Sequence, residues 1–361
     1  MQGNVLYLPS TPLNVLLSCA VATRFAADCH SEIWLIDQKS TESNPYYQAL
    51  LNWQSSPFLA VKIFPGKARG KEKLRERQSN FLMIDAGLDI FLPYTIVTGS
   101  DRRIEFQYVM HQLKMQGRQP HGVYLDDGLY SYAGRPYSWI KDPINSLLKK
   151  INYGFWWQEP KTVGASAWIE QAWLFQPDLA VKELQNKVLH KLPSDWFTCE
   201  RIVSLSRILA DVLQFEIDCL IELNVIILVP HPNNIKKIPG YQERVVELIR
   251  DLSLQGYKIG VKYHPRMEQN DVLRLVENGA EVVIPTQLAF EFCLPMFKPG
   301  CQIIGDVGTT MLTSKWLRSD LDVKALLDPQ NEFQQSFIPL MDTLGINVIS
   351  SVEELLNEAR N

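Results

Sequence analysis

The chain has 361 residues, of which 46% are hydrophobic and 21% are charged, and its formal net charge is −4. The length suggests about two domains, and the composition is that of an ordinary globular protein. The negative net charge argues against a general nucleic-acid-binding protein, which would carry a basic stripe. Six cysteines are scattered without a C-x-x-C pair, which argues against a zinc ribbon or a disulfide framework and predicts reduced thiols.

The N-terminus predicts a strand followed by a helix. Apolar residues 5–8 form the expected strand, and Pro12 suits the first turn of the helix that follows. No basic region precedes the apolar stretch, and Ser10, Thr11 and Asn14 interrupt it, which is typical neither of a signal peptide nor of a membrane span. We therefore expect a cytoplasmic protein.

Short apolar segments then alternate with helical patterns. Further strands are expected at 32–37, 60–65, 94–99 and 122–126. Such βαβ alternation predicts a parallel sheet that helices cover on both faces.

The alternation stops and later restarts, which predicts two domains. Residues 138–200, rich in Trp, Lys and Pro, interrupt it and predict a helical, aromatic excursion, and 200–220 have helical spacing of apolar positions. Strands at 224–230, 258–265, 280–285 and 301–306 follow, with a helix at 241–256. The sequence therefore predicts an α/β fold of two Rossmann-like, doubly wound parallel-sheet domains, 1–220 and 221–361.

Polar side chains follow many of the expected strands. They are Ser10-Thr11-Pro12, Ser100-Asp101-Arg102-Arg103 and Asp126-Asp127-Gly128 in the first domain, and His231-Pro232, His264-Pro265-Arg266 and Gly308-Thr309-Thr310 in the second. In open parallel sheets, ligands bind outside the carboxyl ends of the strands. Two such edges that face each other would form an interdomain cleft.

Three short motifs occur in order at these positions. They are an acidic pair with glycine (Asp126-Asp127-Gly128), a His-Pro dipeptide (His264-Pro265) and a threonine pair (Thr309-Thr310). In this order they resemble the motifs of the bacterial sialyltransferases, including the polysialyltransferases, whose two Rossmann-like domains have the GT-B arrangement. The segment "VIPTQLAFEF" (283–292) and the opening "LPSTPLNVLL" are weaker similarities. The resemblance covers both halves of the chain but not 138–200.

The resemblance implies an inverting transfer from a CMP-linked sugar, in which an acceptor hydroxyl attacks the anomeric carbon as CMP leaves. The hydroxyl needs a general base, and a carboxylate is adequate when the transition state has oxocarbenium character. By resemblance that base is one of the acidic pair. We favour Asp127, because the neighbouring Gly128 lets the backbone approach the sugar closely. Asp126 is the reserve candidate, or a residue that only fixes the loop.

The same resemblance assigns the second domain to the donor, and it makes Pro265, and Gly128 of the first domain, expected donor-binding residues. His264, followed by Pro265, is the expected general acid, because a histidine with a pKa of about 6.5 can carry a proton at neutral pH. Thr309 and Thr310 are expected to bind the phosphate at a helix N-terminus, and Glu291 to bind the ribose or cytosine. The ordinary alternatives are a strand end for the His-Pro pair, a helix cap for the threonines and a solvated helix face for Glu291.

A second His-Pro dipeptide, His231-Pro232, follows the first expected strand of the second domain. Its loop is typical of a turn, but the residues leave open whether His231 or His264 matters more. We assign the acid to His264 because its flanking residues better resemble the family.

Candidates on the acceptor side are Thr11 and Asn14, within the opening similarity, and the arginine pair Arg102 and Arg103. The arginines could hold an anionic acceptor, such as a sialic acid carboxylate, by bidentate pairing. A charge pair on a surface loop explains them equally well. No metal or other cofactor is expected, because the acidic pair lacks the intervening residue of a metal-binding D-x-D motif.

The stretch "SLLKKINYGFWWQEPK" (146–161) interleaves lysines with aromatic residues. Trp and Tyr favour membrane interfaces and Lys is attracted to anionic lipid, so one interpretation is peripheral contact with the inner face of a membrane. This would suit an enzyme that extends a lipid-linked glycan. The other interpretation is a lid or helical excursion whose Trp residues pack inward.

Taken together, these patterns predict an inverting, metal-independent glycosyltransferase. It would transfer sialic acid, or a related nonulosonic acid, from a CMP-linked donor to a cell-surface glycan of the capsule or lipooligosaccharide type. The alternatives are a UDP-sugar transferase or epimerase of the same architecture, a two-lobed binding protein without catalysis, and an inactive family member that serves as an assembly partner.

Overall fold

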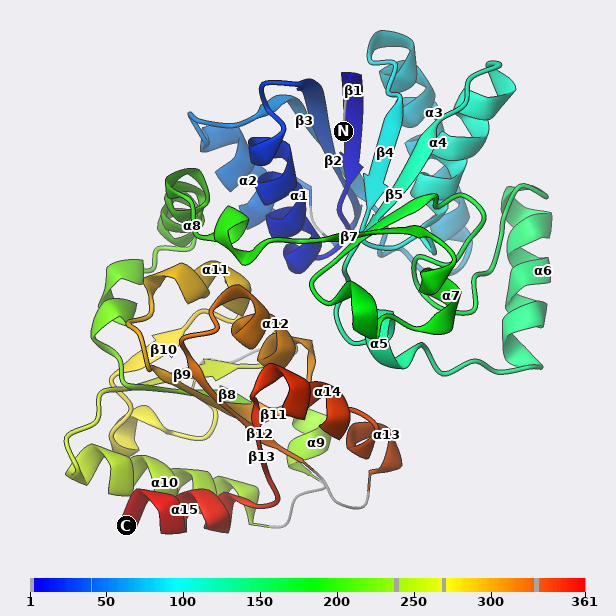
Figure 1. Cartoon of the computed structure of the whole chain (residues 1–361). Helices are drawn as coiled ribbons and strands as arrows, with labels where there is room; N and C mark the ends of the chain where they lie inside the picture. Colours follow the sequence, from blue (N-terminus) through cyan, green and yellow to red (C-terminus); the bar gives the residue numbers. More distant parts are fainter. Residues whose placement is uncertain (1–2, 40, 237–239, 268–270, 328–330, 361) are drawn as a thin grey trace. The chain divides into compact units, whose positions relative to one another are not determined.

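Two α/β units, each built on one parallel β-sheet, make up the chain (Figure 1). The computed structural model describes residues 3–39, 41–236, 240–267, 271–327 and 331–360. The units are Met1–Leu205 and Ser206–Asn361, so their boundary lies within helix α8 (Glu200–Val212). The sequence placed it near residue 220, which lies in the next 3-10 helix, η3 (Ile217–Glu222).

The first sheet has seven parallel strands in the order β3-β2-β1-β4-β5-β6-β7. The strands are β1 (Gly3–Leu8), β2 (Cys29–Gln38), β3 (Phe58–Pro65), β4 (Thr95–Thr98), β5 (His121–Leu125), β6 (Gln171–Leu174) and β7 (Val188–Lys191). Strands β2 and β3 follow on one side of β1, and strands β4 to β7 follow in order on its other side. The switch point between β1 and β4 is where such sheets bind ligands.

Helices flank this sheet and bury its apolar strands. They are α1 (Pro12–Arg24), α2 (Pro45–Asn52), α3 (Gly70–Ile90), α4 (Ile104–Met115), α5 (Tyr130–Ala133), α6 (Lys141–Tyr153) and α7 (Lys182–Gln185), with the 3-10 helices η1 (Pro177–Leu179) and η2 (Ser194–Phe197). Leu6 of β1 belongs to one buried cluster with Leu88 of α3 and Phe106 of α4. Because helices cover both faces, central strands such as β1 and β4 are largely buried.

Residues 138–200 contain more sheet than the sequence indicated. Strands β6 and β7 lie within this segment and extend the first sheet beyond β5. The expected helical, aromatic excursion is therefore only part of the segment. Each of the two strands has four residues, and polar residues such as Gln171 and His190 leave no continuous apolar run in the sequence.

The second sheet has six parallel strands in the order β10-β9-β8-β11-β12-β13. They are β8 (Val225–Val229), β9 (Ile259–Tyr263), β10 (Val282–Ile284), β11 (Gln302–Asp306), β12 (Asp322–Leu326) and β13 (Asn347–Ile349). The first four were expected from the sequence and the last two were not. The switch point lies between β8 and β11.

The helices of this unit are mostly short. They are α9 (Pro232–Ile235), α10 (Tyr241–Leu254), α11 (Phe290–Cys293), α12 (Thr309–Leu317), α13 (Glu332–Gln335), α14 (Ile338–Leu344) and α15 (Val352–Arg360), with the 3-10 helices η4 (Val276–Asn278) and η5 (Leu294–Met296). Ile227 of β8 and Val261 of β9 share a buried cluster with Ile249 of α10 and Leu355 of α15.

These sheets confirm the prediction of two Rossmann-like, doubly wound domains. The expected cleft concerns the mutual placement of the two units and stays a prediction. Within the part of the chain that the structure describes, no helix is long and apolar enough to cross a membrane.

Candidate functional site

Asp126 follows β5 and is fully buried. Its Oδ1 accepts hydrogen bonds from the backbone N–H of Gly128 at 2.9 Å and from Ser131 Oγ at 2.7 Å. Its Oδ2 accepts from the Tyr132 hydroxyl and from the Phe175 N–H at 3.1 Å. Burial raises the pKa of Asp126, and these four donors oppose that rise. They favour the interpretation that Asp126 fixes the loop.

Asp127 is the partly exposed member of the pair. Its Oδ1 accepts one hydrogen bond, from Asn14 Nδ2 at 3.2 Å. Desolvation raises the pKa of Asp127 to about 7, and the charges of Asp126 and Asp101 add to this rise. The hydrogen bond from Asn14 and the charge of Arg103 act in the opposite direction. A carboxyl group with a pKa near neutrality is suited to take a proton from a hydroxyl.

Asn14 is held in place by the start of α1. The backbone N–H of Asn14 donates to Thr11 Oγ1 at 3.2 Å, so Thr11 is the cap of the helix. Ser10 Oγ lies 3.5 Å from Asn14 Oδ1. A Cβ atom at Gly99 would lie 2.0 Å from Asn14 Nδ2, so any other residue there would displace the Asn14 side chain. Of the two predicted acceptor ligands here, Thr11 caps a helix and Asn14 holds Asp127.

Gly99 was missed by the sequence reasoning. The available signal was a glycine directly after strand β4, where the backbone approaches another group closely. Its partner could not be read from the sequence, because Asn14 and Gly99 meet only after β1 and β4 have paired.

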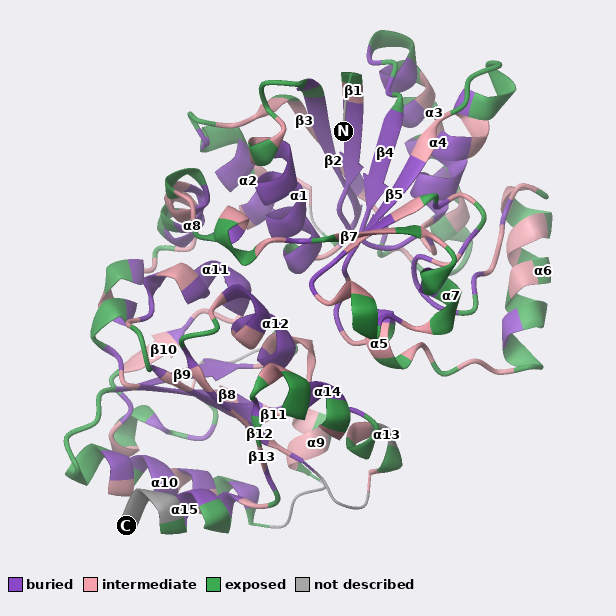
Figure 2. Cartoon of the chain, in the orientation of Figure 1, coloured by how far each residue is buried: buried purple, intermediate pink, exposed green. Residues whose placement is uncertain are grey.

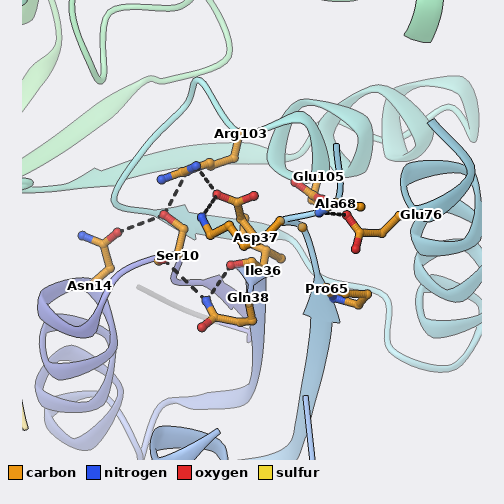
Figure 3. A network of polar contacts seen from close by, with 12 residues as sticks. Ser10, Asn14, Ile36, Asp37, Gln38, Pro65, Ala68, Glu76, Arg103 and Glu105 are labelled. Carbon is orange, nitrogen blue, oxygen red and sulfur yellow. Dashed lines mark hydrogen bonds and ion pairs between the residues drawn. The ribbon is translucent and has the colours of Figure 1, made fainter. Parts of the chain in front are cut away.

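The side chain of Arg103 contacts one residue at the carboxyl end of β1 and one at the carboxyl end of β2. Its Nε donates to Ser10 Oγ at 3.0 Å, and its Nη1 forms an ion pair with Asp37. Asp37 also pairs with Arg77 at 2.7 Å and with Lys67 at 2.8 Å. Burial by itself would raise the pKa of Asp37, but the three cations outweigh burial and lower it. Figure 3 shows Arg103 in contact with both Asp37 and Ser10.

Arg102 is also engaged inside the first unit. Its guanidinium forms an ion pair with Glu159, which Lys149 joins at 3.0 Å. Burial would raise the pKa of Glu159, but these two cations lower it. Both predicted acceptor-binding arginines thus have internal carboxylate partners, and a role in binding an anionic acceptor stays a prediction.

The second unit brings its two His-Pro motifs together. His231 follows β8 and His264 follows β9, and their ring centroids lie 4.8 Å apart. His231 Nδ1 accepts from the backbone N–H of Asn233 at 3.0 Å, and His264 Nδ1 accepts from that of Arg266 at 3.1 Å. In the neutral His264 ring the proton is therefore on Nε2, from which it can be donated.

Arg266 completes this cluster and was not predicted as a site residue, although it stands in the quoted His-Pro-Arg segment. Its Nη1 lies 3.3 Å from Nε2 of His231. Burial lowers the pKa of His264, and the neighbouring His231, Arg266 and Lys262 lower it further. Several N–H donors thus converge at the carboxyl ends of β8 and β9, which is an arrangement suited to an anion. Binding of an anion would raise the pKa of His264 again.

The threonine pair opens helix α12. Gly308 precedes Thr309 in extended conformation, and no side chain caps this N-terminus. Asp306, at the end of β11, accepts from Asn234 Nδ2 at 3.1 Å, and burial raises the pKa of Asp306. The N-terminal N–H groups of a helix favour a phosphate. The position of Thr309 and Thr310 agrees with the role expected for them, which stays a prediction.

Glu291 is buried in α11 and does not lie on a solvated helix face. It accepts from Thr313 Oγ1 at 3.0 Å, and burial raises the pKa of its carboxyl group. Lys262 is also buried, and burial lowers the pKa of its ammonium to about 8. Its Nζ donates to the Pro285 carbonyl at 2.9 Å. Recognition of ribose or cytosine by Glu291 stays a prediction.

Among the described residues, no group of three or more His, Cys, Asp or Glu side chains is arranged to hold a metal ion. The polar groups described above offer two kinds of chemistry. In the first unit this is a carboxyl group that titrates near neutral pH, and in the second it is a set of N–H donors.

Comparison with known proteins identifies the fold. An α/β-galactoside α-2,3-sialyltransferase from Photobacterium phosphoreum matches 98% of this chain and 100% of its own, with a TM-score of 0.57 and 12% identity. The GT-B domain of a Photobacterium damselae sialyltransferase matches 96% of this chain and 98% of its own, with a TM-score of 0.55 and 13% identity. The chain has the GT-B fold.

The same fold occurs in enzymes that act on other nucleotide sugars. A UDP-GlcNAc 2-epimerase from Methanocaldococcus jannaschii matches 99% of this chain and 91% of its own, with a TM-score of 0.54 and 12% identity. No protein-family model and no curated protein matches the sequence. At these identities the structural similarities establish the fold and leave the reaction to be inferred from the site residues.

Proposed function

We propose that this GT-B protein is an inverting glycosyltransferase that transfers sialic acid, or a related nonulosonic acid, from a CMP-linked donor to a cell-surface glycan. The observation that carries the proposal is the environment of Asp127. This partly exposed carboxyl group has a pKa raised to about 7 and stands beside Gly128 at the carboxyl end of β5. The order of the acidic pair, the His-Pro and the threonine pair along the chain supports the same reaction.

In the proposed reaction Asp127 takes the proton of an acceptor hydroxyl. The hydroxyl oxygen forms a bond to the anomeric carbon from one face, and the bond from that carbon to the CMP phosphate oxygen breaks on the opposite face. The electron pair of the broken bond stays on the phosphate. Asn14 keeps Asp127 oriented, and its N–H favours the ionised form that acts as the base.

The leaving phosphate requires positive charge or N–H donors. We assign this role to Nε2 of His264 and of His231, the guanidinium of Arg266 and the N-terminus of α12. As negative charge builds on the phosphate, it raises the pKa of His264 and stabilises the protonated ring, which can then donate a hydrogen bond or its proton to the phosphate oxygen. Glu291, buried next to Thr313, is assigned to the nucleoside.

Thermal unfolding of the purified protein with CMP, UDP, GDP or ADP, each with and without EDTA, tests the donor. A ligand at a hundred times its dissociation constant should stabilise the protein by about 2.7 kcal/mol. We expect CMP alone to raise the midpoint, with no effect of EDTA. Transfer from CMP-sialic acid to a panel of glycans would then test the reaction.

A UDP-sugar enzyme is the second candidate, because a UDP-GlcNAc 2-epimerase has a similar structure over nearly the whole chain. A midpoint shift with UDP and not with CMP would replace the proposed donor. A shift with none of the nucleotides would contradict both candidates and favour a two-lobed binding protein without catalysis.

A further inference from the structure

Helix α6 carries its apolar side chains on its exposed face. The α6 stripe consists of Ile140, Ile144, Leu147, Leu148, Ile151 and Phe155, and each of these side chains is more than half exposed. Within the helix their spacing is i, i+3, i+4 and i+7, which places them on one side. Trp139, just before the helix, is 78% exposed. In Figure 2 most of α6 is coloured as exposed.

Two charged side chains of the same helix, Asp142 and Lys149, face the protein. Asp142 is buried and accepts from Arg135 Nη2 at 2.8 Å and from the backbone N–H of Ser138 at 2.7 Å. Seven residues later, Lys149 pairs with Glu159 and lies 4.0 Å from the ring centroid of the buried Trp157. An ordinary surface helix has the reverse arrangement, with charges in water and apolar residues inside.

The two tryptophans of the stretch that first suggested a membrane contact are not part of this exposed face. Trp157 is buried, and Trp156 packs against the core, with its ring stacked on His111 at 5.6 Å. The inward-packing interpretation is therefore correct for these two residues. It does not account for the α6 stripe, whose side chains are exposed although the two tryptophans pack inward.

The charges around the stripe indicate what it contacts. Lys141–Tyr153 contains four charged residues, of which Asp142 and Lys149 are ion-paired on the inner side. The other two are Lys141, which is exposed, and Lys150, which is half-buried. By helical spacing they lie on opposite edges of the stripe. An anionic surface complements this arrangement, whereas a second copy of the same face would bring like charges together.

We propose that the α6 stripe docks on the surface of an anionic lipid bilayer, with the helix lying in the plane of the interface. The aliphatic side chains enter the boundary between headgroups and acyl chains, and Trp139 lies at headgroup level. Lys141 and Lys150 contact the lipid phosphates. This inference goes beyond the proposed reaction and does not depend on it.

Co-sedimentation of the full-length protein with phosphatidylcholine vesicles, with and without phosphatidylglycerol, tests this inference. We expect binding to the anionic vesicles that weakens as salt is raised. The variant Leu147→Glu/Ile151→Glu should bind them at least about tenfold more weakly. The matched control is Ile90→Glu/Leu254→Glu, which changes two equally apolar, exposed residues elsewhere and should bind like the wild type.

All four substituted side chains are exposed, so both variants should unfold at close to the wild-type temperature. Lys141→Glu/Lys150→Glu, which leaves the apolar residues intact, should also weaken binding to anionic vesicles. Failure of the wild type to bind these vesicles would overturn the proposal, as would unchanged binding by the Leu147→Glu/Ile151→Glu variant. A dimer that this variant abolishes in size-exclusion chromatography would assign the stripe to a second copy of the chain instead.

Discussion

Asn14 and Asp127 form one hydrogen bond, although they are 113 positions apart in the chain. The bond decides how easily Asp127 ionises, because desolvation raises its pKa and the amide N–H of Asn14 lowers it. Gly99 leaves the space in which the amide lies. Three residues from α1, β5 and the end of β4 therefore set the chemistry of one carboxyl group.

Asp127→Asn should lower transfer by about a hundredfold to ten-thousandfold, because an amide cannot take the proton of the acceptor. CMP binding, measured by calorimetry, should be nearly unchanged. In the wild type, kcat/KM should rise as pH increases through about 7, since the base acts only when ionised. An equal loss of transfer and of CMP binding would contradict the role as base and indicate a structural turn.

Asn14→Ala should move the rising limb of this pH profile to higher pH. The substitution removes a donor to the ionised carboxylate, and the pKa of Asp127 then rises further. The pH dependence of kcat/KM measures the shift. Asn4→Ala is the control, because it removes an asparagine amide at the opposite end of β1, where that amide donates to the Leu92 carbonyl. Equal pH profiles for Asn14→Ala and the wild type would show that Asn14 does not tune the base.

Arg266→Ala should weaken CMP binding by about tenfold to a hundredfold, the usual effect of losing a charge-assisted hydrogen bond. Binding of cytidine, which lacks the phosphate, should be unchanged. Arg250→Ala, on the exposed side of α10, is the matched control. If both ligands lost affinity equally, Arg266 would support the loop and would not bind phosphate.

At the scale of elements, Asp37 joins three parts of the first unit. It stands at the end of β2 and pairs with Arg77 of α3 and with Arg103, which directly precedes α4. Its backbone has a φ of 60°, a conformation that is uncommon for residues other than glycine. The ion pairs hold the ends of β2, α3 and α4 together next to the switch point of the sheet.

Asp37→Ala should lower the free energy of unfolding by about 3 kcal/mol, because it leaves the buried Arg77 without one of its carboxylate partners. Urea denaturation measures the change. Asp218→Ala is the control, since it breaks an exposed ion pair with Arg207 and should cost less than about 1 kcal/mol. Similar losses in the two variants would mean that the Asp37 network is not a stabilising feature of the fold.

At the scale of the whole molecule, the proposed donor ligands all belong to the second unit, and the proposed base belongs to the first. Hydrogen exchange with CMP should therefore protect the segments after β8, β9 and β11. The amides after β5 should change little, because CMP carries neither the transferred sugar nor the acceptor hydroxyl from which Asp127 takes the proton. Protection confined to Met1–Leu205 would show that the nucleotide binds to the first unit, which would contradict our proposal.

The sequence alone was sufficient for the fold class and for the positions of the motifs. Continuous apolar runs such as 224–230 predict buried parallel strands, and polar residues directly after them must lie at one edge of a sheet. Local order along the chain carries this information. Strands β6, β7, β12 and β13 were missed, because polar residues such as His190 of β7 and Lys324 of β12 interrupt or border their short apolar runs.

Contacts between segments that are distant in the sequence could be identified only from the tertiary structure. The bond from Asn14 to Asp127, the approach of His231 to His264 and the buried state of Glu291 arise only when the strands of each sheet have paired. The outward apolar face of α6 is a similar case. Its spacing was visible in the sequence, but the burial of Asp142 and Trp157 decides which side of the helix faces the solvent, and no local pattern records that choice.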